Sequence, residues 1–312
     1  MKLRSVIATL LLLLTASVFG QKEEQAEALY EDVHVLINAK QYDKAAKLLK
    51  KITGMKMDVS HQVNYLVSLG TLYRDSLGNE KEALKYLEKA HGLEQKLSAE
   101  KDLDVDDFGN MIAAHSALSE VAESAKDYKR MQAMNECGLR FYDEVVKPQI
   151  PANNDDLSLD VMYCQLCTSL GKALGMQGNY DEAAKAFEKG VQAADAVISR
   201  PRGSRVFYVQ KWMVRFLYSQ MYSQAKGDKG KAYQVLRANV PEIERAIRIN
   251  DEDLRKALDQ QGPLFILQIA NAAYEAGAYA ECEQFCADAL TWPNKQYNAA
   301  VQELREKAKQ KL

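Results

Sequence analysis

Apolar residues beyond residue 20 recur at intervals of three and four, a spacing that places them on one face of an α-helix. Short turns interrupt this pattern, and four of them contain a glycine: Gly78, Gly178, Gly227 and Gly277. Glycine adopts a left-handed backbone without steric cost, which is the conformation that often ends a helix. The pattern therefore predicts an all-α protein made of short-turned antiparallel helix pairs.

One unit recurs along the chain: an apolar helix, a tight turn, a Tyr or small residue, and a second helix with Ala where the two helices cross. The clearest copy runs from Leu170 to Gly190. The crossing residue is Ala45, Ala83, Ala183 and Ala232 in different copies. Only a small side chain fits where two helix backbones approach closely, so we expect these alanines to be buried.

These small and large residues, spaced over about 34 positions, resemble the tetratricopeptide repeat. The resemblance is strong at 170–190, moderate at 69–90 and 270–293, and weak near Met131, where a bulky residue replaces the crossing Ala. It implies a right-handed α-solenoid of stacked antiparallel helix pairs, about six in residues 21–295. Residues 296–312 are predicted to form a polar C-terminal capping helix, which a solenoid needs at its end.

Proline and glycine mark the expected joins between pairs. We expect a long loop at residues 148–157, a break at Pro201–Gly203, and the start of the sixth pair at Gly262–Pro263.

The resemblance also implies a concave groove that binds an extended peptide or a partner helix. Its expected lining comes from the outward positions of the first helix of each pair: Asn64, Thr71, Arg74, Gln165, Thr168, Lys172, Gln220, Gln268, Asn271 and Tyr274. Relatives that grip a C-terminal carboxylate use a Lys/Asn/Arg cluster in adjacent pairs. Here only Lys172 and Asn271 match, in non-adjacent pairs, so no such clamp is predicted.

An aromatic-rich segment supplies candidate anchors for a partner, because aromatic residues are enriched in binding hot spots. Its members are Tyr208, Trp212, Phe216, Tyr218 and Tyr222. We expect most of them in the core and one or two at the surface.

Residues 1–20 have the features of a secretory signal peptide. Lys2 and Arg4 precede the apolar run from Val6 to Leu14, and Val18 and Gly20 supply small side chains before the cleavage point. Cleavage would leave Gln21 first, and no Cys follows the apolar run to carry a lipid. We therefore expect an exported, periplasmic or secreted protein; an uncleaved membrane anchor is the alternative.

Charge and composition narrow the range of partners. The chain has 41 basic and 43 acidic residues, so it lacks the basic excess that phosphate neutralisation needs, and nucleic acid is not an expected partner. No segment after residue 20 is apolar enough to span a membrane.

The cysteines and an acidic segment offer candidate chemistry. Five cysteines are an odd number for a disulfide framework. Cys164 and Cys167 have redox or metal spacing but lie within a predicted helix, and Cys282 and Cys286 lie about three repeats away, so we expect core side chains and no zinc site. Residues 102–107 begin like a calcium loop, but Asp107 and Ala113 replace the required Gly and Glu. We expect an acidic helix start.

No catalytic signature is present: the chain lacks a Gly-x-Ser-x-Gly elbow, a P-loop and a dinucleotide fingerprint. The four histidines, His34, His61, His91 and His115, are dispersed along the sequence. The sequence predicts no cofactor, no metal site and no enzyme activity.

The expected function is that of an exported scaffold or adaptor that binds a protein or peptide in its concave groove. The alternative from another class is a cell-envelope hydrolase or glycan-binding component built on a helical solenoid. It would need convergent carboxylates or a His in a deep pocket. A self-associating structural array is the third possibility.

Overall fold

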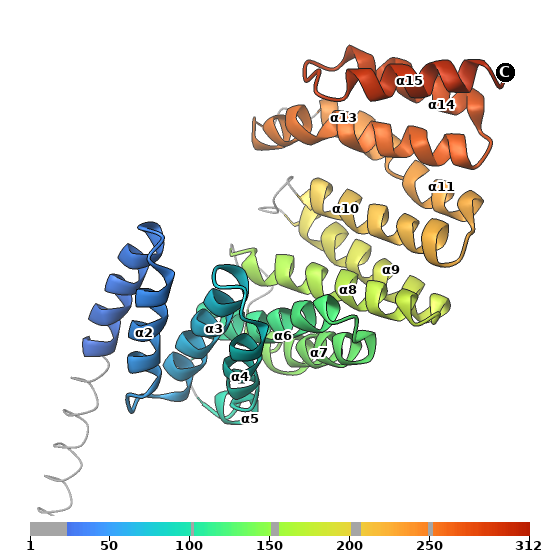
Figure 1. The fold of residues 1–312 in the computed structure, drawn as a ribbon. Helices are drawn as coiled ribbons and strands as arrows, with labels where there is room; N and C mark the ends of the chain where they lie inside the picture. Colours follow the sequence, from blue (N-terminus) through green and yellow to red (C-terminus); the bar gives the residue numbers. More distant parts are fainter. Residues whose placement is uncertain (1–23, 101–102, 151–155, 201–206, 249–251) are drawn as a thin grey trace, which may run out of the picture. The chain divides into compact units, whose positions relative to one another are not determined.

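The computed structural model describes residues 24–100, 103–150, 156–200, 207–248 and 252–312 (Figure 1). Every regular element in these ranges is helical, and none of them contains a β-strand, so the predicted all-α class is confirmed. The predicted signal peptide at 1–20, the break at 201–203 and the centre of the loop at 148–157 lie outside the described residues. Among the helices described, none is both long enough and apolar enough to cross a bilayer.

The chain divides into two compact units. Unit 1 is formed by the described residues up to Ala125 together with Arg140–Pro148; unit 2 is formed by Lys126–Leu139 and the described residues from Gln149 to Leu312. The prediction that a single array runs through residues 21–295 stays a prediction.

Unit 1 begins with a helix at residues 24–38 and continues through five further helices. These are α2 (Tyr42–Thr53), α3 (Val59–Asp75), α4 (Glu80–His91), the short α5 (Glu94–Leu97) and α6 (Val105–Ser124). The last residues of α7 (Tyr128–Phe141) and the π-helix η1 (Tyr142–Val146) complete it. α3 packs against α2, α4 and α6. The core of unit 1 includes one fully buried residue from each of these four helices: Leu49, Leu69, Leu87 and Phe108.

Unit 2 contains most of α7 and a series of helices that pack on one another in chain order. They are α8 (Ser158–Met176), α9 (Tyr180–Ile198), α10 (Phe207–Gln220), the π-helix η2 (Met221–Ala225), α11 (Lys229–Arg237), α12 (Val240–Arg248), α13 (Glu252–Glu275), α14 (Tyr279–Thr291) and α15 (Asn298–Lys309). Trp212, Phe265 and Ile269 belong to its larger core cluster.

The predicted crossing alanines and turn glycines are confirmed. Ala45, Ala83 and Ala183 are fully buried and Ala232 nearly so. The four predicted turn glycines all have positive φ, from 61° to 82°, and are the glycines with that conformation among the described residues. Lys40 and Lys126 adopt the same left-handed conformation, with φ of 56°. They occupy the equivalent turns of the two pairs that lack a glycine there.

The acidic segment before α6 is a helix start, as predicted. The carboxylate of Asp104 accepts a hydrogen bond from the Asp107 backbone N–H at 2.9 Å, and the Asp107 carboxylate accepts one from the Asp104 N–H at 3.0 Å. This reciprocal pair is a capping box, which satisfies two N–H groups that otherwise lack helical partners.

The prediction that Gly262–Pro263 opens a helix is wrong. Both residues lie buried inside α13, which begins at Glu252. A Cβ added at Gly262 would lie 2.2 Å from Cζ3 of Trp292, so the absent side chain makes room for that ring. The packing of α13 on α14 outweighs the local cost of the proline, which is about 3 kcal/mol in a helix interior.

Helix α12 was not anticipated from the repeat pattern. Pro241 is its second residue, and a proline costs little there because the first turn's N–H groups have no helical acceptor. Pro241 was therefore the sequence signal for the start of α12, and the repeat pattern did not include it.

Candidate functional site

Two hollows lie side by side on unit 2 and share Gln220 and Gln224 among their lining residues. The first, of about 380 Å³, is formed by α8, the start of α9, the end of α10 and η2. The second, of about 210 Å³, is formed by α10, η2, α11 and α13. We call the two hollows together the unit 2 groove. Its lining residues are Lys172, Gly175, Met176, Gly178, Tyr180, Phe187, Phe216, Leu217, Ser219, Gln220, Met221, Ser223, Gln224, Ala225, Lys229, Ala232, Leu236, Gln268, Asn271, Ala272 and Glu275.

The first hollow combines an apolar interior with polar residues. Met176 is 51% exposed, which is unusual for a large apolar side chain, whereas Phe187, which also lines this hollow, is fully buried. A Cβ added at Gly175 would lie 2.6 Å from Cγ of Met221, so the absent side chain lets α8 approach η2. Flexible methionines suit a surface that adapts to a bound segment.

The π-helix η2 supplies residues to both hollows. The hydroxyl of Tyr180 donates a hydrogen bond to the Ala225 carbonyl at 2.6 Å and ties the end of η2 to the start of α9. The ammonium of Lys226 lies 5.6 Å from the centre of the Tyr180 ring. Such π-turns inside helices occur frequently at functional sites.

The second hollow contains a buried acceptor without a donor. Oε1 of Gln268 is buried and accepts no hydrogen bond from any residue that the structure describes. Asn271, one turn later on α13, is exposed and donates through Nδ2 to the Leu267 carbonyl at 3.0 Å. Lys229 and Glu275 form a 3.7 Å ion pair between α11 and α13 beside them. A buried acceptor without a hydrogen bond lowers the stability of the fold. A ligand that donates a hydrogen bond to Gln268 would therefore bind with a more favourable free energy.

The structure brings together four of the predicted groove residues: Lys172, Gln220, Gln268 and Asn271. Gln165 is exposed on α8 but does not line either hollow, and Tyr274 packs edge-on against Tyr279 with ring centres 5.3 Å apart. Thr168 was expected to face outward, and this is wrong. It is 8% exposed, and its hydroxyl donates to the Cys164 carbonyl at 2.7 Å.

The three residues predicted in the second pair, Asn64, Thr71 and Arg74, all lie on α3 in unit 1. Thr71 donates to the Val67 carbonyl at 2.9 Å. Arg74 pairs with Asp75 and with Glu120 on α6, both at 2.5 Å, so its guanidinium joins two helices of unit 1.

Sequence reasoning missed Met176, Met221, Ser223 and Gln224. The signal that would have found two of them is the four-residue spacing of a helix face. Gln224 follows Gln220 by four positions, and Met176 follows Lys172 by four, although a π-turn intervenes in the first case.

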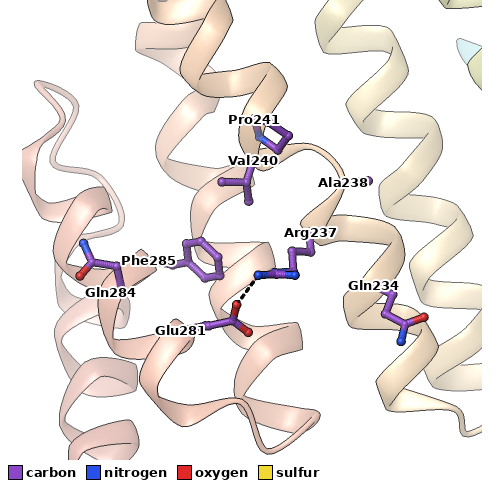
Figure 2. A pocket seen from close by; sticks show the side chains of 8 residues that line it. All are labelled: Gln234, Arg237, Ala238, Val240, Pro241, Glu281, Gln284 and Phe285. Atoms are coloured by element: carbon purple, nitrogen blue, oxygen red, sulfur yellow. Dashed lines mark ion pairs between the residues drawn. The ribbon is translucent and has the colours of Figure 1, made fainter.

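A third and larger hollow of unit 2, of about 620 Å³, lies between α11, the start of α12 and α14 (Figure 2). Arg237 Nη2 lies 2.7 Å from Glu281 Oε1, and the hydroxyl of Tyr233 donates to the other Glu281 oxygen at 2.7 Å. Burial and this carboxylate raise the pKa of Tyr233. Because both oxygens of Glu281 are engaged, this carboxylate is poorly placed to act as an acid or base.

The predicted core cysteines are confirmed. Cys164, Cys167, Cys282 and Cys286 are all fully buried, and none of the four forms a disulfide bond within the described part of the chain. Of the five aromatic residues in the 208–222 segment, Tyr208, Trp212, Tyr218 and Tyr222 are buried, whereas Phe216 is partly exposed and lines the second hollow.

No protein-family model matches the sequence, and no curated protein is significantly similar to it. Among solved structures, the chain is similar to the TPR-like repeats assigned to a kinesin light chain from Podosopora anserina. The identity is 13% and the TM-score 0.51, over 72% of this chain and 98% of that one. A tetratricopeptide repeat protein from Parabacteroides merdae is 14% identical over 91% of this chain and 98% of its own, but with a TM-score of 0.30. The first likeness supports the fold alone: an all-α solenoid of tetratricopeptide-like helix pairs.

Proposed function

We propose that this tetratricopeptide-like chain is a non-catalytic scaffold that binds a segment of a partner protein in the unit 2 groove. The observation that carries the proposal is the buried, unpaired Oε1 of Gln268, a residue that lines the second hollow. A peptide backbone offers N–H donors at regular intervals, so an extended segment can supply the missing hydrogen bond once the Gln268 amide turns toward the hollow.

The side chains of the groove match such a segment. The amides of Gln220, Gln224 and Asn271 can each donate and accept, which suits the alternating donors and acceptors of a polypeptide backbone. The apolar interior around Met176 and Phe187 can hold an apolar side chain. The one carboxylate that lines the groove, Glu275, is paired with Lys229. We therefore expect a segment of low net charge.

The chain is further proposed to act outside the cytoplasm, in a periplasm or as a secreted protein. The support is the signal-like pattern of residues 1–20: two basic residues, a short apolar run and small residues before Gln21. An intact mass of the chain recovered from its native host that begins at Gln21 would agree with export. A mass that includes Met1 would favour the uncleaved anchor.

The rival function is a hydrolase or glycan-binding component. A hydrolase of this kind needs a pair of carboxylates or a His in one pocket. No two carboxylates line any one of the three hollows of unit 2 described above, and no His lines them. This arrangement favours the scaffold.

Partner capture from the exported fraction, compared between two variants, tests the proposal. Gln224→Arg places a long charged side chain in both hollows, whereas Gln192→Arg makes the same change at an exposed position of α9 outside them. We expect one or more specific partners whose recovery falls about tenfold with Gln224→Arg, equivalent to about 1.4 kcal/mol of binding. Equal recovery by the two variants, or no specific partner, contradicts the proposal. Release of sugars from envelope glycan by the wild-type chain would favour the rival.

A further inference from the structure

Three potential metal ligands meet in unit 1, far from the groove residues in sequence. His91 is the last residue of α4, Glu94 is the first of α5, and His115 lies in the middle of α6. One ligand atom from each lies within 4.8 Å of the others. Oε2 of Glu94 lies 3.0 Å from Nε2 of His115 and 3.5 Å from Nδ1 of His91. The two imidazole rings have centres 5.0 Å apart and planes at 72°.

The polar atoms of this cluster are buried without hydrogen-bond partners. His115 is fully buried, and neither of its ring nitrogens makes a hydrogen bond to any described residue. The same holds for Nδ1 of His91 and Oε2 of Glu94. The 3.0 Å approach of His115 to Glu94 therefore lacks hydrogen-bond geometry. Buried polar atoms in proteins almost always have a bonding partner. A single ligand that binds all three side chains is the simplest explanation for these unpaired atoms.

We propose that His91, Glu94 and His115 bind a divalent transition-metal ion, with Zn²⁺ as the best fit. Zinc bonds to imidazole nitrogen and carboxylate oxygen are about 2.0–2.2 Å long, so adjacent ligands of a tetrahedral ion lie roughly 3.3–3.6 Å apart. The two measured separations are close to that spacing, and small side-chain shifts would complete it. Two imidazoles and one carboxylate favour zinc and its neighbours over Mg²⁺ or Ca²⁺, which prefer oxygen ligands.

The surroundings of the cluster allow an ion to enter and be held. The side chains of His91 and Glu94 are 33% and 24% exposed, so the cluster lies close to the surface of unit 1, and a small side-chain movement would admit the ion and a water molecule as fourth ligand. Arg140 is the nearby positive charge that acts against a cation here.

The site would join three helices of unit 1. An ion held by the end of α4, the start of α5 and the middle of α6 would add a direct link among these three helices. Binding to the folded state only would stabilise unit 1. The sequence contained a partial signal, since Glu94 follows His91 by three positions, but His115 comes from a different helix.

The test uses the full mature chain without a histidine tag, freed of metal by a chelator and titrated with Zn²⁺ by calorimetry. Glu94→Gln and His91→Gln each remove one ligand at a partly exposed position, so the fold is expected to survive. His61→Gln is the matched control, because His61 also contacts a carboxylate, Asp58, at 2.8 Å but is not part of the cluster. Circular dichroism of each variant checks its helix content.

We expect one equivalent of Zn²⁺ to bind the wild-type chain and the His61→Gln variant with equal affinity. Each ligand variant should lose affinity by a factor of at least about 10–100. Co²⁺ bound at the same site should show the strong visible absorption of a four-coordinate ion. Absence of stoichiometric binding, binding that both ligand variants retain, or a weak octahedral Co²⁺ spectrum would overturn the proposal.

Discussion

The reactivity of the cysteines follows from their burial. Burial raises the pKa of Cys164 and of Cys286 to about 12, and the thiolate is the form that reacts. Cys137 is partly exposed. We expect a thiol reagent at neutral pH to modify the folded chain at Cys137 alone, and all the cysteines after denaturation, as read by peptide mass spectrometry. Modification of Cys164 in the folded chain at the rate of Cys137 would show that this core is open.

A buried lysine makes Glu242 important for the stability of unit 2. Nζ of Lys211, in a residue only 4% exposed, lies 2.7 Å from Glu242 and 2.6 Å from Asp195. Glu242 also pairs with Arg215 at 2.9 Å. Glu242→Ala leaves a buried charge poorly compensated, and we expect a loss of about 3 kcal/mol in the free energy of unfolding.

Asp195→Ala is the matched comparison. The Asp195 side chain is 51% exposed, so its loss should cost at most about 1 kcal/mol. Tryptophan fluorescence in a urea titration follows both variants, because both tryptophans, Trp212 and Trp292, belong to unit 2. Equal losses for the two variants would show that Glu242 has no special role.

At the residue scale, the sequence predicted those positions whose role is set by local geometry. Ala183 and Gly178 were identified because close helix crossing demands a small side chain and a left-handed turn demands a glycine. Thr168 was misplaced because one step along a helix rotates a side chain by about 100°, and the groove face is narrow. The cluster of His91 and His115 depends on how α4 meets α6, which side-chain spacing within one helix does not encode.

The contact between α8 and α9 depends on a missing side chain at Gly171. A Cβ added there would lie 2.8 Å from the ring of Phe187, which is fully buried and cannot easily move. We expect Gly171→Ala to lower the free energy of unfolding of unit 2 by about 1–3 kcal/mol, as overpacked core sites do. Thermal unfolding followed by tryptophan fluorescence measures it.

Gly230→Ala provides the control for helix propensity. Gly230 lies near the start of α11, and an added Cβ there would approach only Asp228, at 3.7 Å. Alanine favours a helix over glycine by up to about 1 kcal/mol, so this variant should be as stable as the wild-type chain or slightly more so. If Gly171→Ala is also as stable as the wild-type chain, then the close approach of α8 and α9 does not require a glycine at position 171.

Helix α15 covers one side of α14 with a narrow apolar stripe. Val301, Leu304 and Ala308 are buried, and Arg305 pairs with Glu283 of α14 at 2.6 Å. Val301→Asp places a carboxylate in this contact, and we expect a loss of about 2–4 kcal/mol. Gln302→Asp makes the same addition at an exposed neighbour and should change stability by less than about 0.5 kcal/mol. Chemical denaturation gives the free energy of unfolding of both variants. A loss for Val301→Asp as small as that for Gln302→Asp would mean that α15 detaches easily from α14.

At the scale of elements, the period of the apolar residues predicted the helices well where a turn glycine separated them. It failed at α13, because Pro263 was taken as a start signal although tertiary burial holds it inside the helix. It also missed α12, whose nine residues are too few for a full repeat pattern. Local signals specify helix existence, whereas helix bounds depend on packing against neighbours.

At the scale of the molecule, repeat order is the reason that part of the groove was predictable. When helix pairs stack, residues at equivalent positions of successive first helices face the same side. This placed Lys172, Gln220, Gln268 and Asn271 along α8, α10 and α13. The π-turn of η2 was not predictable from the repeat, because it inserts a residue into the helical register and brings Gln224 into both hollows.

The most direct measurement is site-specific photocrosslinking from the unit 2 groove in the native host. A photoreactive phenylalanine analogue replaces Gln224 in the groove or, as the matched control, the exposed Gln192 of α9. If the groove binds a partner segment, illumination joins the chain to a defined protein from position 224 and not from position 192, and the crosslinked peptide has low net charge. Equal crosslinking from both positions, or none from position 224, would contradict the proposal that this groove holds a partner.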